Sequence, residues 1–216
     1  MPNFDPASFT IMIVVILLSL SIHEFAHAKF ADMAGDPTPR LMGRVTLNPL
    51  AHLDPIGTIM IVLSSMSGFG IGWGEPVLVD PRKMKNPRWD HFASVAAGPV
   101  SNLLQAALYG LAFRLLVGGV HNAENAGLVG LFLFAGVIIN VSLALFNLVP
   151  IGPLDGHWLV GAFLPEPQRL QWYRFNRGIG GFIFIALVLM PPGPFDILGR
   201  VLRPAVMTLV RLFLGA

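Results

Sequence analysis

The sequence predicts an all-α polytopic membrane protein with about five to six membrane helices and a short re-entrant, β-like segment near a candidate active site. Composition is the first reason, because 54% of the 216 residues are hydrophobic and 12% are charged. Soluble domains carry about 25% charged residues, so roughly half of the usual charge is missing. The second reason is that apolar stretches of helix length recur along the chain. We therefore expect one membrane-embedded domain over residues 1–216.

The apolar stretches are separated by glycine, proline and polar residues, which end helices. The stretch 56–69 is about 14 residues long, which is short for a full span and fits a re-entrant helix. Residues 44–49 and the glycine-rich stretch 68–80 beside it have strand-like composition. The expected helices cover about residues 7–30, 56–69, 89–117, 127–148, 178–190 and 197–214.

Basic residues indicate how the helices are oriented. Segments 29–44, 82–88 and 169–177 hold ten of the fourteen Lys and Arg residues, whereas 1–8 and 118–127 hold none. By the positive-inside rule, the basic segments are cytoplasmic. The chain between 31 and 91 would then leave and re-enter on one side, as the short apolar stretch suggests. We expect an integral membrane protein, in a prokaryotic cell membrane, with its active site toward the cytoplasmic side.

The central motif lies near the end of the first expected helix, where residues 21–27 read Ser-Ile-His-Glu-Phe-Ala-His. His23 and His27 are four positions apart, about 40° around a helix and one turn above each other, so both imidazoles can face one metal ion. Glu24 adjoins them, and this H-E-x-x-H pattern predicts a zinc site with a carboxylate that accepts a proton from water. A His-Glu-His cluster at membrane depth is costly, and a bound metal explains it.

Two histidines leave a catalytic zinc ion short of one protein ligand. The chain contains no cysteine, so nitrogen and oxygen must supply every ligand. Asp155 follows a long apolar helix in a stretch broken by proline and glycine, whereas Asp54 flanks the short segment. His157 is a weaker third candidate. From the residues alone, Asp155, Asp54 and His157 all remain open. A sequence pI near 9.4 does not indicate nucleic-acid binding, because the basic residues lie in short loops.

Residues 21–27, taken together with the stretch 146–156 (Phe-Asn-Leu-Val-Pro-Ile-Gly-Pro-Leu-Asp-Gly), resemble the site-2 protease family of intramembrane zinc metalloproteases. The stretches 72–77 and 97–102 also resemble what bacterial and archaeal members carry. The resemblance covers about residues 14–160. It differs from many members in having the H-E-x-x-H motif in the first helix. No PDZ-like or CBS-like insertion is evident, so the chain resembles the compact type.

The resemblance implies one Zn²⁺ per chain, bound by His23, His27 and Asp155, with Glu24 as general base. It further implies that three residues contribute to substrate binding: Asn147, Pro153 and Asn102. The implied substrates are single-span membrane proteins within the lipid bilayer. The metalloprotease core would cover about residues 7–160, followed by C-terminal helices over 178–214. The sequence does not indicate an oligomeric state.

The expected activity is therefore intramembrane hydrolysis of peptide bonds, by the mode called regulated intramembrane proteolysis. A divalent-metal transporter is the main alternative. It would also place His and Asp in the membrane, but at several depths and without a Glu beside the water position. A catalytically inactive homologue that binds membrane proteins is the second alternative, and an intact Glu24 argues against it.

The last expected helix carries three arginines in one stripe. Arg200, Arg203 and Arg211 fall at about 0°, 300° and 20° around the helix axis. Such a helix is a poor lone span, so we expect it to lie in the membrane interface with the arginines toward the headgroups. Pro204 is expected to interrupt it midway.

Overall fold

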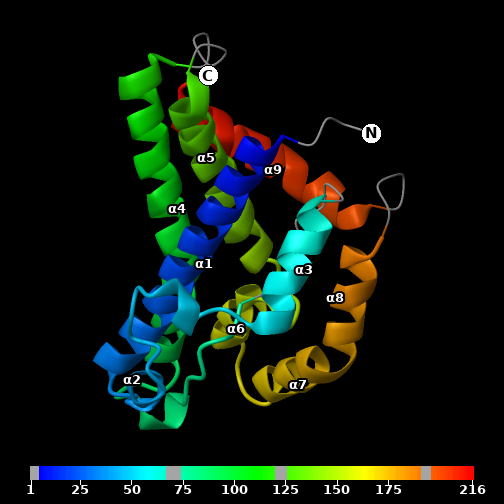
Figure 1. Cartoon of the computed structure of the whole chain (residues 1–216). Helices are drawn as coiled ribbons and strands as arrows, with labels where there is room; N and C mark the ends of the chain where they lie inside the picture. The colour runs from blue at the N-terminus through cyan, green and yellow to red at the C-terminus, as the bar shows by residue number, and fades with distance from the viewer. Residues whose placement is uncertain (1–4, 67–73, 120–125, 191–195) are drawn as a thin grey trace.

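Three long helices form the body of the protein. The structure, a computed structural model, describes residues 5–66, 74–119, 126–190 and 196–216. Figure 1 shows α1 (Pro6–Ala34), α4 (Trp89–Val117) and α5 (Gly127–Asn147) as a bundle. Among the described residues, these three helices are long and apolar enough to cross a membrane. The helical membrane fold is thereby confirmed, whereas a count of five to six spans stays a prediction.

Shorter helices surround this bundle. One end of it carries α2, α6 and α7, while α9 crosses near the other end (Figure 1). Two of the short helices, α6 and α7, lie where the sequence predicted only a polar connection. The remaining elements are α2 (Thr38–Leu41), η1 (Pro49–Ala51), α3 (Pro55–Met66), η2 (Pro81–Lys83), α6 (Asp155–Phe163), α7 (Gln168–Phe175), the π turn η4 (Asn176–Gly180), α8 (Gly181–Val188) and α9 (Ile197–Leu214).

Local capping explains where the long helices begin and end. The Asp5 carboxylate accepts hydrogen bonds from the backbone N–H groups of Ala7 and Ser8 and so caps α1. Gly35, at φ 112°, ends α1 in the left-handed conformation that glycine adopts without strain. Between these caps, residues 9–22 are largely apolar, as a span requires.

Small residues let the helices approach closely, as is usual between helices in membranes. Gly136 of α5 packs against the Tyr109 ring, where an added Cβ would come within 2.5 Å of the ring carbon Cγ. Gly110 of α4 packs against Phe213 of α9, where an added Cβ would lie 2.6 Å from the Phe213 carbonyl oxygen. The buried apolar core that joins α4, α5 and α9 consists of Ala106, Phe113, Leu133, Val137, Val141, Val210 and Leu214.

The expected β-like segment is only partly present. Leu53 and Gly74 form an isolated antiparallel bridge, and Glu75 N–H donates to the His52 carbonyl at 2.9 Å. Residues 75–80 carry no helix or ladder. The expected strand at 44–49 is wrong, because that stretch bends and the Asn48 side chain caps a 3-10 turn. The glycine-rich part of the prediction, residues 67–73, lies outside the described residues.

α9 is one continuous helix, so the predicted interruption at Pro204 is wrong. Pro204 lies on the exposed side of α9, where loss of one backbone donor does not disturb the packed side. The packed side includes Val210 and Leu214, each 3% exposed. The hydroxyl of Thr208 donates to the Pro204 carbonyl and so satisfies one acceptor near the proline.

We predict that Gly110→Ala loosens the docking of α9 on α4, because its Cβ would collide with the Phe213 backbone. Overpacking of this kind costs about 1–3 kcal/mol, so thermal unfolding in detergent should shift down by several degrees. Gly181→Ala is the matched control, since nothing lies within 4 Å of a Cβ there. An equal melting temperature for Gly110→Ala and wild type would contradict this account.

Candidate metal centre

Two helices bring three potential ligands to one point. His23 and His27 come from α1, one turn apart, and Asp155 is the first residue of α6. The two Nε2 atoms lie 3.0 Å apart, and each lies 3.3 Å from Asp155 Oδ2. Both imidazoles are buried, at 3% and 8% exposure. In the part of the chain that the structure describes, this is the one group of three His, Cys, Asp or Glu residues that could hold a metal ion.

A series of hydrogen bonds between buried amides holds His23 on the side away from Asp155. His23 Nδ1 lies 2.6 Å from Asn102 Oδ1, and Asn102 Nδ2 donates to Asn140 Oδ1 at 2.9 Å. Asn140 Nδ2 in turn donates to the Gly136 carbonyl and to the Ser19 hydroxyl, both at 2.9 Å. Asn102, Asn140 and Ser19 are fully buried. These hydrogen bonds therefore connect α5 through α4 to α1 without contact with solvent.

The direction of these hydrogen bonds decides the tautomer of His23. A carbonyl can only accept a hydrogen bond, so the Gly136 carbonyl fixes Asn140 Nδ2 as a donor. Asn140 Oδ1 then faces Asn102, whose Nδ2 must donate, and Asn102 Oδ1 is left facing His23. His23 Nδ1 therefore carries the proton, and its Nε2 presents a lone pair. Metal-binding histidines are oriented in this way by their second nitrogen.

His27 is held in the same tautomer by α4. Its Nδ1 donates to the Ser94 carbonyl at 2.9 Å, and the Ser94 hydroxyl donates back to the His27 carbonyl at 3.0 Å. Because the Ser94 carbonyl can only accept, Nδ1 carries a proton, and in the neutral ring Nε2 presents a lone pair. As neutral rings, both imidazoles would offer Nε2 as a ligand on the side of Asp155.

The arrangement fits a bound cation. Asp155 Oδ2 is buried and makes no hydrogen bond among the described residues, although the two Nε2 atoms are close to it. In their neutral form, the two rings bring two nitrogen lone pairs to the same carboxylate oxygen, which is unfavourable in a buried site without a positive charge. Nitrogen and oxygen ligands in this number are those of catalytic zinc sites, which keep a fourth position open.

Gly98 of α4 forms the wall behind the ligands. An added Cβ would lie 2.4 Å from His27 Nε2 and 2.7 Å from His23 Cε1. The backbone of α4 thus reaches the imidazole edges at a position where only glycine fits. Pro99 follows it inside the helix, fully buried.

Glu24 is held beside the ligands by the extended segment 75–80. Its Oε2 accepts a hydrogen bond from the Val77 backbone N–H at 3.2 Å. The buried Asp36 carboxylate anchors the far end of this segment by accepting from the Asp80 N–H at 2.6 Å. Burial raises the pKa of Asp36, but the hydrogen bonds from Thr38 and Asp80 outweigh burial and keep that pKa below its ordinary value. The carboxylate is therefore ionised and holds the segment in place.

The structure separates the three candidates for the third ligand. Asp155 joins the histidines, whereas Asp54 caps α3 by accepting from the Gly57 N–H at 2.6 Å. His157 Nδ1 lies 2.5 Å from the Leu154 carbonyl, and burial lowers the pKa of its imidazole. Its backbone carbonyl accepts from the Trp172 indole at 2.7 Å, so this residue ties α6 to α7.

The residues expected to bind substrate have differing surroundings. Asn102 is fully buried behind His23, so its contacts support a role in holding that ligand. Asn147 is half-buried, and its Nδ2 donates to the Leu143 carbonyl of its own helix at 3.0 Å. Pro153 is exposed, two residues before Asp155. Asn140 and Ser94 were not predicted as site residues, because an amide or hydroxyl in an apolar helix carries no local signal of its partner.

Comparison with known proteins agrees with this geometry. "Putative zinc metalloprotease YwhC" of Bacillus subtilis is 36% identical over 188 residues, covering 85% of this chain and 82% of the relative. "Putative zinc metalloprotease Rip2" of Mycolicibacterium smegmatis is 30% identical over 190 residues, covering 85% of this chain and 68% of the relative. The chain belongs to the site-2 protease family, peptidase family M50. The sequence profile of "Peptidase family M50" itself matches residues 112–191. No solved structure matches the chain.

Membership of the M50 family makes the chain a metalloprotease. The profile match includes Asp155 and Asn147, while the H-E-x-x-H motif at residues 23–27 lies outside it. The structure links the two regions, because the Nε2 atoms of His23 and His27 each lie 3.3 Å from Asp155 Oδ2.

We predict that Asn140→Ala weakens metal binding, although residue 140 touches no ligand directly. Without its amide, Asn102 loses the partner that fixes its orientation, and His23 loses its preferred tautomer. Loss of such an outer partner typically lowers metal affinity about 10–100-fold. Competition between the purified protein and a chelator, with Zn²⁺ as the probe ion, measures this.

Asn147→Ala is the matched control, because it removes an amide of the same helix that bonds only within α5 in the described contacts. It should keep the wild-type affinity for Zn²⁺. Equal affinities for Asn140→Ala and Asn147→Ala, in proteins of similar melting temperature, would remove the amide hydrogen bonds from the account.

Proposed function

We propose that this protein is an intramembrane zinc metalloprotease that hydrolyses peptide bonds of membrane-spanning substrates. The observation that carries the proposal is the convergence of His23, His27 and Asp155 inside a bundle of apolar helices. The names of the relatives, which call them zinc metalloproteases, support Zn²⁺ as the metal.

The three converging residues would hold one zinc ion per chain. Zinc bound in such a site polarises a peptide carbonyl and lowers the pKa of a coordinated water toward about 7. The protein contributes the fixed tautomers of His23 and His27, so that no proton has to leave either imidazole when the metal binds. Asn102 and Ser94 keep the rings in this state through their hydrogen bonds to the two Nδ1 atoms.

Glu24 is proposed as the general base. It follows His23 directly on α1, and its carboxylate is fixed by the Val77 N–H on the side of the extended segment. From this position it would accept a proton from the attacking water and donate it to the leaving amine. Such acid–base catalysis typically contributes 10²–10⁴-fold to the rate.

The extended segment 75–80 is the proposed surface for an unwound substrate. The peptide bonds of a membrane helix are hidden within its own hydrogen bonds, so part of a substrate must unwind before hydrolysis. An unwound stretch gains backbone hydrogen bonds when it adds to an extended edge. Asn147 at the end of α5 and Pro153 just before Asp155 are proposed to line the substrate path. Single-span membrane proteins are the proposed substrates, and regulated intramembrane proteolysis is the proposed mode.

We infer that the metal centre faces the cytoplasmic side of a prokaryotic cell membrane. The three basic segments support this, because they gather at the end of the bundle that carries α6. Lys85 N–H donates to the Ala34 carbonyl at 3.1 Å. Arg88 donates to the carbonyls of Ala162 and Leu164, at 2.6 and 3.1 Å. Basic loops mark the cytoplasmic side of membrane proteins.

A metal transporter is less well supported than a protease. Its ligands should follow a path at several depths, whereas the ligand group found within the described residues is a single one. Glu24, held beside that group, has a place in hydrolysis and none in simple passage of an ion.

We predict that Asp155→Ala loses most bound zinc at neutral pH, because it removes the only carboxylate of the group. Metal content per chain, measured after purification without chelators, tests this. Asp54→Ala is the control and should keep its zinc, since Asp54 caps α3 instead. Equal zinc retention in both variants would remove Asp155 as a ligand.

We also predict that Glu24→Gln keeps zinc and lowers cleavage of single-span substrates by at least about 10²-fold. Glutamine retains the size and the acceptor for the Val77 N–H but cannot accept a proton. Glu166→Gln is the control, because Glu166 is exposed and pairs with Arg169 away from the centre. Undiminished cleavage by Glu24→Gln would overturn the assignment of the base.

A further inference from the structure

The four Lys and Arg residues outside the three basic segments all lie on α9 or beside its end. Arg200, Arg203 and Arg211 lie on α9, and Arg114 lies in the last turn of α4. The Arg114 guanidinium donates to the Leu212 carbonyl and reaches the end of α9, where an added Cβ on Gly215 would lie 2.9 Å from its Nε. The sequence separates Arg114 from the others by more than 80 residues, and only the fold unites them.

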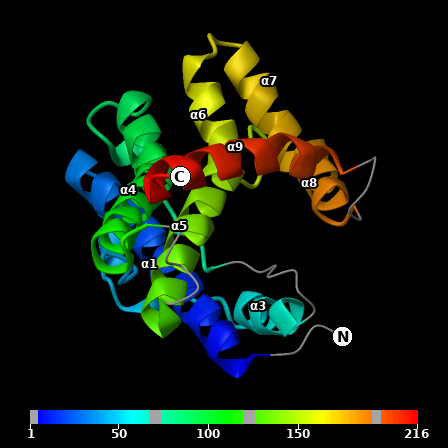
Figure 2. The ribbon, with the colours of Figure 1, turned by 90° about the horizontal axis from the view of Figure 1, so that it is seen from above.

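This group lies at the end of the bundle opposite the candidate metal centre. Gly98 of α4 touches His23 and His27, and Gly110 of the same helix touches Phe213 of α9. Twelve residues of α-helix separate these two glycines, which is about 18 Å along the axis. Seen from above, α9 lies across the end of the bundle (Figure 2). Seen from the side, it crosses obliquely near the start of α1 (Figure 1).

The outward side of α9 has two different flanks. At 100° per residue, the arginine stripe spans about 80° of the circumference. Next to it, between about 60° and 120°, lie Ile197, Val201 and Leu212, which are 59%, 66% and 63% exposed. By the same count, the core residues Val210 and Leu214 fall at about 280° and 320°, so the packed side adjoins the arginine stripe at Arg203. An apolar flank beside a basic flank, on a helix held against a membrane bundle, matches the boundary between acyl chains and headgroups.

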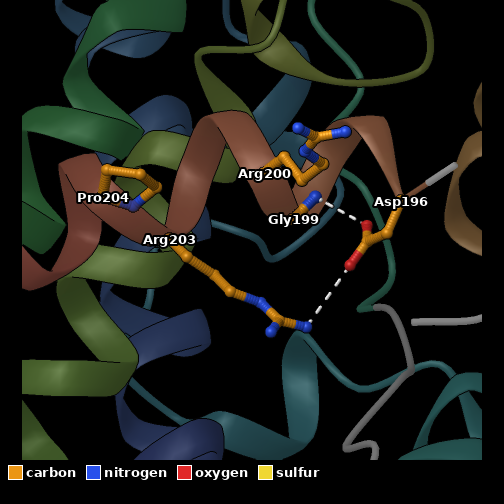
Figure 3. A pocket seen from close by; sticks show the side chains of 5 residues that line it. All are labelled: Asp196, Gly199, Arg200, Arg203 and Pro204. Atoms are coloured by element: carbon orange, nitrogen blue, oxygen red, sulfur yellow. Dashed lines mark hydrogen bonds and ion pairs between the residues drawn. The ribbon is translucent and has the colours of Figure 1, made fainter. Parts of the chain in front are cut away.

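A pocket lies within the basic flank (Figure 3). Its volume is about 460 Å³, and it is lined by Asp196, Gly199, Arg200, Arg203 and Pro204. The Asp196 carboxylate is engaged on both oxygens, by the Gly199 N–H at 2.8 Å and by Arg203 at 3.3 Å. The lining contains two arginines and one aspartate, so its net charge is positive. Guanidinium groups bind phosphate oxygens with paired N–H donors.

We propose that α9 is a docking surface for anionic phospholipids in the leaflet opposite the metal centre. A headgroup phosphate occupies the pocket beside Arg200 and Arg203, Arg211 extends the basic flank, and the acyl chains lie along Ile197, Val201 and Leu212. The two flanks together select a lipid over an acidic protein segment, because a lipid supplies a phosphate and hydrocarbon side by side. The surface anchors α9, and through its packed side it supports α4 and α5.

The absence of cysteine allows a local test. Thr208→Cys places one thiol on the exposed side of α9, next to both flanks, where a fluorophore can be attached. The labelled full-length protein is reconstituted in phosphatidylcholine vesicles. These contain a small fraction of either phosphatidylglycerol or phosphatidylcholine carrying a nitroxide near the headgroup. Quenching of the fluorophore reports which lipid resides at α9.

The expected result is stronger quenching by nitroxide phosphatidylglycerol than by nitroxide phosphatidylcholine, with a preference that falls as salt is raised. One basic residue near an anionic surface contributes about 1 kcal/mol, or roughly fivefold in occupancy. Arg200→Gln with Arg203→Gln should therefore lower the preference roughly tenfold or more. Arg169→Gln with Arg174→Gln, two arginines of the α7 end, should leave it unchanged.

Three results would overturn the proposal. The first is equal quenching by the two lipids in the wild-type background. The second is a preference that survives Arg200→Gln with Arg203→Gln, in a protein whose zinc content shows that it is folded. The third is quenching by neither lipid, which would mean that the outward side of α9 faces something other than the bilayer. Loss of the preference on adding inorganic phosphate, but not chloride of equal ionic strength, would assign the pocket to free phosphate instead.

Discussion

The structure depends on how two histidines are buried in an apolar helix bundle. Their Nε2 atoms lie 3.0 Å apart, and both face the Asp155 carboxylate. Burial of neutral imidazoles that meet in this way is favourable only when each Nδ1 has a fixed acceptor and a cation lies between the Nε2 atoms. The Asn102 amide oxygen and the Ser94 carbonyl accept hydrogen bonds from the two Nδ1 atoms, and Asp155 lies beside the Nε2 atoms. Helix packing, loop anchoring and chemistry all follow from this requirement.

The requirement explains why α4 packs against both α1 and α5. On α4, the Ser94 carbonyl accepts a hydrogen bond from His27, and Asn102 accepts one from His23. Gly98 of the same helix leaves room for both rings. The same helix reaches α9 through Gly110, about 18 Å along the axis from Gly98. A helix fixed at both ends in this way keeps the ligand rings rigid, which a catalytic site requires.

The two ends of the bundle serve different purposes. One end gathers the basic segments, the segment 75–80 and the converging ligands, so that polar groups and non-helical backbone lie together. Backbone without a helix is tolerated at membrane depth only where protein or a watery cavity covers it. The other end carries α9 with its two flanks, which match a flat boundary between water and lipid. The division separates the region for chemistry from the region for anchoring.

The sequence by itself determined the elements whose signals are local. Apolar runs and glycine breaks give α4 and α9 with the bounds that the structure has, and α1 and α5 within a few residues. The H-E-x-x-H spacing gives His23, Glu24 and His27, because helical periodicity alone puts positions i and i+4 on one face. The short helices α6 and α7 were missed, because eight or nine residues with mixed polarity carry a weak period.

Only the tertiary structure decided what depends on distant partners. It separated Asp155 from Asp54 and His157, because the residues alone did not show which of the three lies beside the histidines. It showed that Asn102 holds His23, and that Asn140, 38 residues further along, belongs to the same series of hydrogen bonds. It kept α9 continuous through Pro204 and brought Arg114 to its end. A side chain's role in a buried network is set by its neighbours in space, and no local period encodes them.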